Sequence, residues 1–347
     1  MKVSILTYHW EDNYGAVMQA YATVRAIKEL GHEPELIDFR LPYSPSPAQR
    51  CVFALKRRRF NRFRKRHYGR LTPKTYRSLD ELRREAPSSD CYLVGSDQTW
   101  NPNIAGEKLP AFFLDFGPDS VRRVTYATSI GQNSWVPTRY MPDEEIRRSL
   151  KKFHRVLLRE DSAVKICREV FGRDASQVID PVLLFPSYPE LTGEVKPSGE
   201  IIAYKLIDDE GFYEMASKLA SDKQLPIRSI GSVRRPKGYR SAYPESPEKW
   251  LSRFVGASFV ITDSFHGTVF SLLYHRPFLI YVGDPTRTTR IESLLRQVGL
   301  SDRLLTSANS YSDFRRVAET PIDWVAVDAR LKELRRHSFD LLKESLS

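Results

Sequence analysis

The first forty residues constrain the fold more than any other part of the chain. Val3-Ser4-Ile5-Leu6 has the pattern of a short buried strand, and apolar residues then recur at helical spacing from Val17 to Leu30, where Gly31 ends the predicted helix. Residues 35–39 again have the pattern of a strand. Strand, helix and strand in so short a stretch indicate a parallel, right-handed crossover, which is the building block of open α/β sheets.

The same alternation continues along the chain. Further strands are predicted at 92–94, 124–127, 156–158, 178–179, 201–204, 227–230 and 259–261. In an open α/β sheet, ligands sit beyond the carboxyl ends of the strands.

Length and one proline-bearing stretch divide the chain. At 347 residues it exceeds the usual size of one hydrophobic core, which favours two domains. Residues 185–199 carry several prolines and are typical of a linker. We therefore expect an α/β fold with two Rossmann-like domains, 1–190 and 191–347, facing a cleft. The helix predicted from Trp324 to Leu346 is expected to cross back to the first domain.

A lone histidine stands where the predicted strand at 259–261 passes into a helix. The first turn of a helix offers free N–H groups and a positive dipole end to an anion, and His266 beside it can exchange a proton near neutral pH. Gly267 permits close backbone approach, and Ser264 and Thr268 supply hydroxyls for a ligand oxygen. The alternative is structural: a buried histidine beside two helix-capping hydroxyls.

The positive charge of the chain is concentrated in one segment. Residues 50–70 hold ten Lys or Arg and no acidic residue, so a net charge of +11 leaves +1 for the rest. With Phe53, Phe60 and Phe63 interleaved, the segment fits an amphipathic helix that rests on an anionic membrane or another polyanion. A solvated helix without a partner is the alternative. No zinc-finger or RNA-recognition motif accompanies the segment, which disfavours nucleic acid.

The remaining sequence features narrow the function by what they omit. No apolar run reaches the roughly 20 residues of a membrane helix, and Glu11 follows the N-terminus too closely for a signal peptide. We expect a cytoplasmic protein, with peripheral binding to the inner face of the cell membrane as a further hypothesis. The sequence has no GxGxxG, GxxxxGK[ST], HExxH or GxSxG motif.

Five segments, taken in order, resemble the polysaccharide pyruvyl transferase family. They are Asn13-Tyr14-Gly15-Ala16-Val17-Met18-Gln19-Ala20-Tyr21, Val94-Gly95-Ser96-Asp97-Gln98-Thr99-Trp100-Asn101, Ser129-Ile130-Gly131, Asp180-Pro181-Val182-Leu183-Leu184 and Thr262-Asp263-Ser264-Phe265-His266-Gly267-Thr268. The resemblance implies a GT-B-like fold and transfer of a pyruvyl group from phosphoenolpyruvate to a sugar as a ketal. It implies an acceptor side in 1–190 and a phosphoenolpyruvate side in 191–347, with no cofactor besides this donor.

The resemblance also assigns residues to the donor. His266 matches the family's catalytic histidine and is expected to protonate the methylene carbon, as general acid catalysis requires. Arg159 matches the donor-binding arginine, and a guanidinium suits the carboxylate and phosphate of the donor. Ser264 and Phe265 are expected to bind the donor from the same turn as His266.

One departure from the family pattern concerns the cation near the histidine. Some relatives carry an arginine where this chain has Ser264. We expect Arg290 or Arg287 to take its place at the phosphate, although an arginine at a helix start is often only solvated.

The acceptor sugar is expected at the first loop and helix of the chain and at a later turn. The residues assigned to it are Asn13, Tyr14, Gln19, Asp97 and Gln98. Asp97 also suggests a metal ligand, but a divalent cation needs several oxygen ligands and no DxD pair is near, so no metal is expected. A turn that caps the next helix is the structural alternative.

Two other functions remain open at this point. The first is a GT-B glycosyltransferase that uses a nucleotide sugar, because a fold does not fix a function. The second is a non-catalytic polyanion-binding protein in which residues 50–70 are the functional element.

Overall fold

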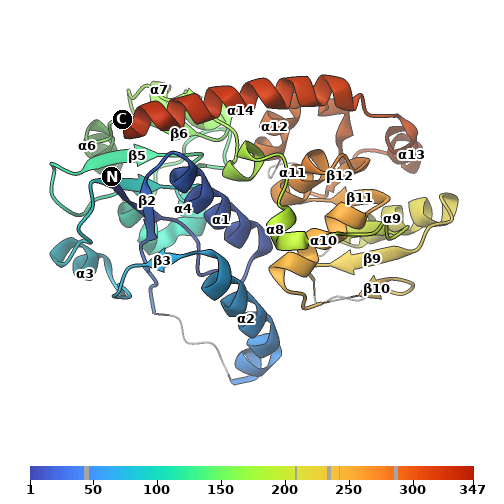
Figure 1. Cartoon of the computed structure of the whole chain (residues 1–347). Helices are drawn as coiled ribbons and strands as arrows, with labels where there is room; N and C mark the ends of the chain where they lie inside the picture. Colours follow the sequence, from blue (N-terminus) through green and yellow to red (C-terminus); the bar gives the residue numbers. More distant parts are fainter. Residues whose placement is uncertain (43–46, 208, 233–235, 242, 285–287) are drawn as a thin grey trace. The chain divides into compact units, whose positions relative to one another are not determined.

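The computed structural model describes residues 1–42, 47–207, 209–232, 236–241, 243–284 and 288–347, and of residues 47–52 the backbone alone. The expected phosphate contact of Arg287 lies outside the described residues. The chain forms two units (Figure 1). The first comprises Met1–Val52, Arg64–Phe185 and Glu333–Ser347, and the second comprises Phe53–Phe63 and Pro186–Lys332.

The first unit is built on a five-stranded parallel sheet in the order β3-β2-β1-β4-β5. Its strands are β1 (Lys2–Leu6), β2 (Glu33–Leu36), β3 (Arg70–Leu71), β4 (Cys91–Val94) and β5 (Arg122–Thr125). A two-stranded parallel sheet follows, with β6 (Leu157–Leu158) and β7 (Ser176–Gln177). The helices are α1 (Tyr14–Glu29), α3 (Leu79–Arg84), α4 (Pro102–Ala105), α5 (Leu109–Phe112), α6 (Asp143–Lys151) and α7 (Asp161–Glu169).

Local capping sets the bounds of α1. The helix begins three residues before the predicted start because the Asn13 side chain accepts a hydrogen bond from the backbone N–H of Ala16 at 3.1 Å. It ends before Gly31, whose φ of 78° suits a glycine. The strand predicted at 35–39 lies at Glu33–Leu36 instead.

The second unit is built on a six-stranded parallel sheet in the order β10-β9-β8-β11-β12-β13. Its strands are β8 (Ile201–Tyr204), β9 (Ile227–Ile230), β10 (Arg240–Ser241), β11 (Phe259–Thr262), β12 (Phe278–Val282) and β13 (Leu304–Thr306). The helices are α8 (Pro189–Thr192), α9 (Glu210–Asp222), α10 (Pro247–Gly256), α11 (Phe265–Leu273), α12 (Thr289–Val298) and α13 (Tyr311–Glu319). The central strands are almost wholly buried, as a sheet covered on both faces requires.

Two long helices have residues in both units (Figure 1). The last helix, α14 (Trp324–Leu346), belongs to the first unit from Glu333 onward, in agreement with the expected return of this segment. Helix α2 (Pro47–His67) differs from expectation, because residues 53–63 group with the second unit whereas the whole basic segment was assigned to the first domain. Both units alternate strands and helices around a parallel sheet, which is the predicted α/β fold.

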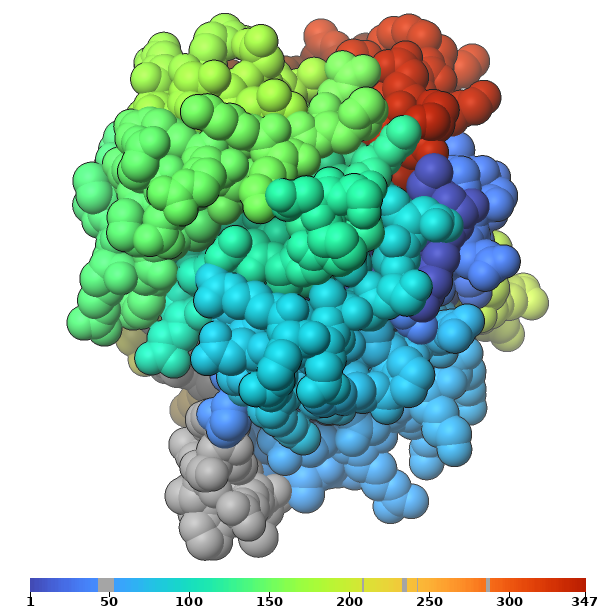
Figure 2. Space-filling model, turned by 90° about the vertical axis from the view of Figure 1, so that its left-hand side faces the viewer, coloured from blue at the N-terminus to red at the C-terminus, as the bar shows by residue number. Residues whose placement is uncertain are grey.

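Figure 2 shows a face made largely of segments coloured cyan and green, which belong to the first unit. The chain's end, in red, contributes to the same unit, and the Arg122 guanidinium donates a hydrogen bond to the backbone oxygen of Ser345 at 3.2 Å. Among the helices that the structure describes, none combines the length and apolar character needed to cross a membrane.

Candidate functional site

A chain of hydrogen bonds joins the strand ends of the first unit. The Gln19 amide donates to the hydroxyl of Thr7 at 2.9 Å, and that hydroxyl donates to the backbone oxygen of Ser96 at 2.9 Å. The Ser96 hydroxyl in turn contacts the Asp180 carboxylate at 3.2 Å. These residues come from four distant segments, and each follows or faces a strand end. The carboxyl edge of the sheet is therefore held together by side chains.

Arg159 lies at the centre of this edge. Its guanidinium donates to the Asp180 carboxylate at 2.8 Å and approaches the Asp97 carboxylate at 3.4 Å, and its side chain is 2% exposed. Burial lowers the pKa of Arg159, but the carboxylates of Asp180, Asp97 and Glu160 outweigh burial and raise the pKa above its ordinary value. The arginine is thus held charged and in a fixed orientation. The contact with Asp97 is the longer of the two.

Glu160 is a functional candidate that the sequence did not single out. One of its carboxylate oxygens accepts three hydrogen bonds, from the Ser129 hydroxyl at 2.9 Å and from the backbone N–H groups of Ile130 and Gly131 at 2.8 Å each. The side chain is fully buried. These contacts fix the loop Ser129-Ile130-Gly131 to the residue next to Arg159.

The residues assigned to the acceptor differ in accessibility. Asn13 is exposed, and its side chain caps α1. Tyr14 and Gln19 are buried, so their contribution is to the fold of the first loop and helix. Gln98 and Asp97 are partly exposed, and the Gln98 amide oxygen accepts a hydrogen bond from Asn101 at 2.9 Å. Asp97 has a φ of 78°, an unusual value for a residue with a side chain.

In the second unit, the turn between β11 and α11 fixes His266 by local contacts. The Ser264 hydroxyl accepts from the backbone N–H of Gly267 at 3.3 Å, and the Ser264 N–H donates to the Thr262 hydroxyl at 3.0 Å. A Cβ added to Gly267 would lie 2.3 Å from the Thr262 hydroxyl oxygen. Only glycine therefore lets the first turn of α11 lie so close to the end of β11. His266, in that turn, is 6% exposed.

Two further residues predicted to bind phosphoenolpyruvate are Phe265, beside His266, and Arg290, beside Phe265. The rings of Phe265 and His266 are 5.3 Å apart and nearly perpendicular. The guanidinium carbon of Arg290, in the first turn of α12, lies 5.8 Å from the centre of the Phe265 ring. The structure therefore brings Ser264, Phe265, His266 and Arg290 together in the second unit, whereas Arg159 belongs to the first.

A buried ionic cluster borders the same turn and was missed in the sequence. The Lys205 ammonium, which follows β8, lies 3.1 Å from the Asp263 carboxylate and 3.4 Å from the Asp209 carboxylate. Asp263 also accepts from the backbone N–H of Leu206 at 2.8 Å. The loop after β8 is thereby tied to the residue preceding Ser264. Lysine immediately after a central strand is the signal that was available for finding this cluster.

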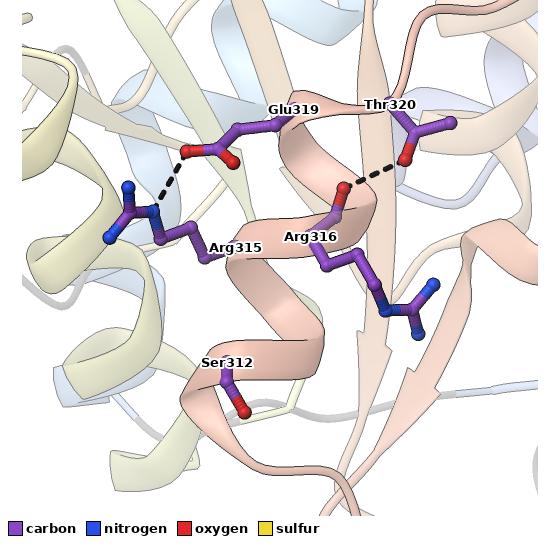
Figure 3. Close-up of a pocket in the computed structure, with 5 residues that line it drawn as sticks. All are labelled: Ser312, Arg315, Arg316, Glu319 and Thr320. Atoms are coloured by element: carbon purple, nitrogen blue, oxygen red, sulfur yellow. Dashed lines mark hydrogen bonds and ion pairs between the residues drawn. The ribbon is translucent and has the colours of Figure 1, made fainter.

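Other places in the molecule offer less. Among the described parts of the chain, no three His, Cys, Asp or Glu side chains gather as metal ligands would, and the expectation of no metal stays a prediction. A shallow surface hollow lies on helix α13 and is lined by Ser312, Arg315, Arg316, Glu319 and Thr320 (Figure 3). There Arg315 is already paired with Glu319 at 2.8 Å, and the hollow is open to solvent.

Comparison with known proteins agrees with this architecture. The sequence model of the family described as polysaccharide pyruvyl transferase matches residues 13–285. No curated protein matches the chain.

Solved structures similar to this chain are GT-B glycosyltransferases and enzymes of related fold. One is the spinosyn forosaminyltransferase SpnP, 15% identical, with 98% of this chain and 95% of that one covered and a TM-score of 0.51. Another is an α-glucosyltransferase in complex with UDP, 9% identical, with 98% and 95% covered and a TM-score of 0.53. A third is the UDP-GlcNAc 2-epimerase of Methanocaldococcus jannaschii, 13% identical, with 92% of each chain covered and a TM-score of 0.53. At these identities the likeness shows the fold alone.

Proposed function

The chain belongs to the polysaccharide pyruvyl transferase family, and we propose that it transfers a pyruvyl group from phosphoenolpyruvate to two hydroxyls of one sugar. The product is a pyruvate ketal, and phosphate is released. The sugar belongs to a surface polysaccharide or its lipid-linked precursor. The observation that carries the proposal is the turn from Thr262 to Thr268, which fixes a buried histidine at the start of a helix beside a sheet edge.

The reaction requires one acid. His266 gives its proton to the methylene carbon of phosphoenolpyruvate, which becomes the methyl group of the ketal. The first sugar hydroxyl adds to the cationic central carbon and returns its proton to the histidine. The second hydroxyl forms the other carbon–oxygen bond as the bond to phosphate breaks, and phosphate leaves with the remaining proton. No metal and no cofactor besides the donor takes part.

The donor is an anion, and we assign it cationic and N–H partners. Ser264 and Phe265 bind it at the turn, and Arg290 balances the charge of its phosphate, in line with the closeness of these residues to His266. Arg159 binds the donor by exchanging its longer contact, that with Asp97. Asp180 then acts as the residue that orients the guanidinium.

The acceptor is assigned to the first unit. Asn13, Asp97 and Gln98 have side chains with some exposure, so they are the proposed direct contacts to sugar hydroxyls. Tyr14 and Gln19, which are buried, support the fold of the first loop and helix. We place the enzyme in the cytoplasm, where phosphoenolpyruvate is made.

Ligand protection tests the donor without knowledge of the acceptor. Thermal unfolding is measured with phosphoenolpyruvate, UDP or GDP for the wild type, for His266→Gln and for the control His337→Gln, which changes an exposed histidine of α14. A ligand at 100 times its Kd raises the free energy of unfolding by about 2.7 kcal/mol. We expect phosphoenolpyruvate, but neither UDP nor GDP, to protect the protein against thermal unfolding.

The other outcomes decide between functions. Protection by UDP or GDP without protection by phosphoenolpyruvate would replace the proposal with a nucleotide-sugar glycosyltransferase. No protection by any of the three would favour a polyanion-binding protein. Arg159→Ala is a poor probe here, because it leaves Asp180 charged and buried and so lowers stability by itself.

A further inference from the structure

Helix α2 carries three exposed basic side chains on the side opposite its buried phenylalanines. They are Arg58, Arg62 and Lys65. Residues 50–70 hold no acidic residue. One apolar side chain, that of Leu55, is 49% exposed on the same side of the helix. We call Leu55, Arg58, Arg62 and Lys65 the basic face.

The opposite side of α2 is anchored. Phe60 and Phe63 are fully buried. The Arg64 guanidinium is 11% exposed and donates to the backbone oxygens of His9 at 3.0 Å and Trp10 at 2.7 Å, and to the Asp12 carboxylate at 2.8 Å. The helix is therefore an ordered element whose basic face is held outward, and its anchor lies in the loop that leads to Asn13.

The last helix shows that such a face is not simply what a long exposed helix of this protein has. On α14 the basic side chains alternate with acidic ones, and Arg336 pairs with Glu333 and with Asp340 on neighbouring turns. That helix presents side chains of both signs of charge to solvent. The charged side chains of the basic face of α2 are all positive.

We propose that the basic face of α2 docks on an anionic membrane surface. Lysine and arginine side chains attract anionic headgroups, while Leu55 can enter the apolar boundary beneath them. A nucleic acid matches the charge but offers no apolar layer for Leu55, so the membrane fits more of the observations. The inference also rests on the proposed function in one respect: docking there would bring the Asn13 loop, through Arg64, to an acceptor carried on lipid.

Vesicle sedimentation of the full chain tests docking without substrate, so its outcome is independent of whether the pyruvyl reaction is correct. Phosphatidylcholine vesicles are compared with vesicles that also contain phosphatidylglycerol. The test variant combines Arg58→Gln, Arg62→Gln and Lys65→Gln. The control variant removes the same charge elsewhere, through Arg84→Gln, Lys218→Gln and Lys332→Gln, all of which are exposed.

We expect the wild type to bind only the anionic vesicles and to dissociate in high salt, since exposed charges are screened over a few ångströms at about 1 M. Each basic residue near the surface contributes roughly fivefold, so the test variant should bind about 100-fold more weakly. The control variant should bind nearly as well as the wild type. Leu55→Ser should weaken vesicle binding and leave binding to duplex DNA unchanged.

Three results would overturn the proposal. The first is absence of binding of the wild type to anionic vesicles, and the second is equal loss in the test and control variants. The third is tighter binding to duplex DNA than to the vesicles, with vesicle binding unaffected by Leu55→Ser. Circular dichroism of each variant establishes that the helices are intact.

Discussion

The two parallel sheets end in polar clusters that differ in how their charges are used. In the first unit, the Arg159 guanidinium is held by Asp180 and approached by Asp97, and a further carboxylate, Glu160, binds the adjoining loop. In the second unit, Lys205 is likewise held by carboxylates, but the next turn carries His266 at the start of a buried helix.

The difference separates a structural cluster from the proposed catalytic site. A buried cation surrounded by carboxylates stabilises and orients, and its charge is available to a ligand only by exchange. In the second unit, by contrast, local backbone contacts fix a turn that holds a histidine at a strand end. We therefore expect changes at the first sheet edge to act mainly on stability, and changes at the second to act on the response to phosphoenolpyruvate.

The largest effect is expected from Asp180→Asn. It removes the shortest carboxylate contact of the buried Arg159 charge, and breaking a buried pair costs about 3–5 kcal/mol. Chemical denaturation measures this loss. Asp119→Asn is the control, because Asp119 pairs with Lys152 at a 76% exposed site and its loss should cost little stability. Equal losses of stability in Asp180→Asn and Asp119→Asn would contradict a stabilising role of the Arg159–Asp180 pair.

Acid sensitivity is the second expected property of the first unit. Burial lowers the pKa of His9 from 6.5 to about 4, with Asp38 opposing and Arg40 adding to the shift. The unfolded chain therefore takes up a proton more readily, so stability is fully present above pH 6.5 and is lost as the pH falls toward 4, by up to about 3 kcal/mol. Unfolding curves at several pH values measure the slope. His9→Gln should remove that part of the slope, and an unchanged slope would exclude His9 as its source.

Gly267→Ala tests the second sheet edge. The added Cβ would meet Thr262, so we expect a loss of about 1–3 kcal/mol together with weaker protection by phosphoenolpyruvate, because the turn that holds His266 must shift. Gly211→Ala is the control, since its Cβ would meet only side-chain oxygens, those of Tyr281 at 3.2 Å and Asp209 at 3.3 Å. Loss of stability with full protection would show that the turn does not bind the donor.

The smallest effect sharpens the comparison most. Asp97→Asn removes a partly exposed charge that competes for Arg159, and asparagine tolerates the φ of 78°. If the donor displaces Asp97, its affinity should rise by up to about fivefold. Calorimetric titration with phosphoenolpyruvate measures it. A weaker affinity would mean that Asp97 itself supports the donor site.

Local patterns predicted much of this molecule, and contacts between distant segments account for the rest. The turn around His266 was predicted because an apolar strand and a helical repeat adjoin in sequence. Neither the chain of hydrogen bonds from Gln19 through Ser96 to Asp180 nor the pairing of Lys205 with Asp263 could be predicted, because each depends on which strands are neighbours.

Helix α2 illustrates the same limit in another way. Its amphipathic pattern and its uniformly positive charge were visible in the sequence, yet the pattern does not say to which unit each turn belongs. The buried position of Phe60 and Phe63 and the anchoring of Arg64 to the first loop appear only in the folded chain.

Transfer of label from phosphoenolpyruvate tests the central claim most directly. Phosphoenolpyruvate labelled in its pyruvyl carbons is incubated with a lipid and polysaccharide extract, and acid-labile label on sugar is measured for the wild type, His266→Gln and His337→Gln. The account predicts transfer by the wild type and by His337→Gln, and a rate lower by roughly 10²–10⁴-fold in His266→Gln, the range that a general acid supplies. Undiminished transfer by His266→Gln would contradict it.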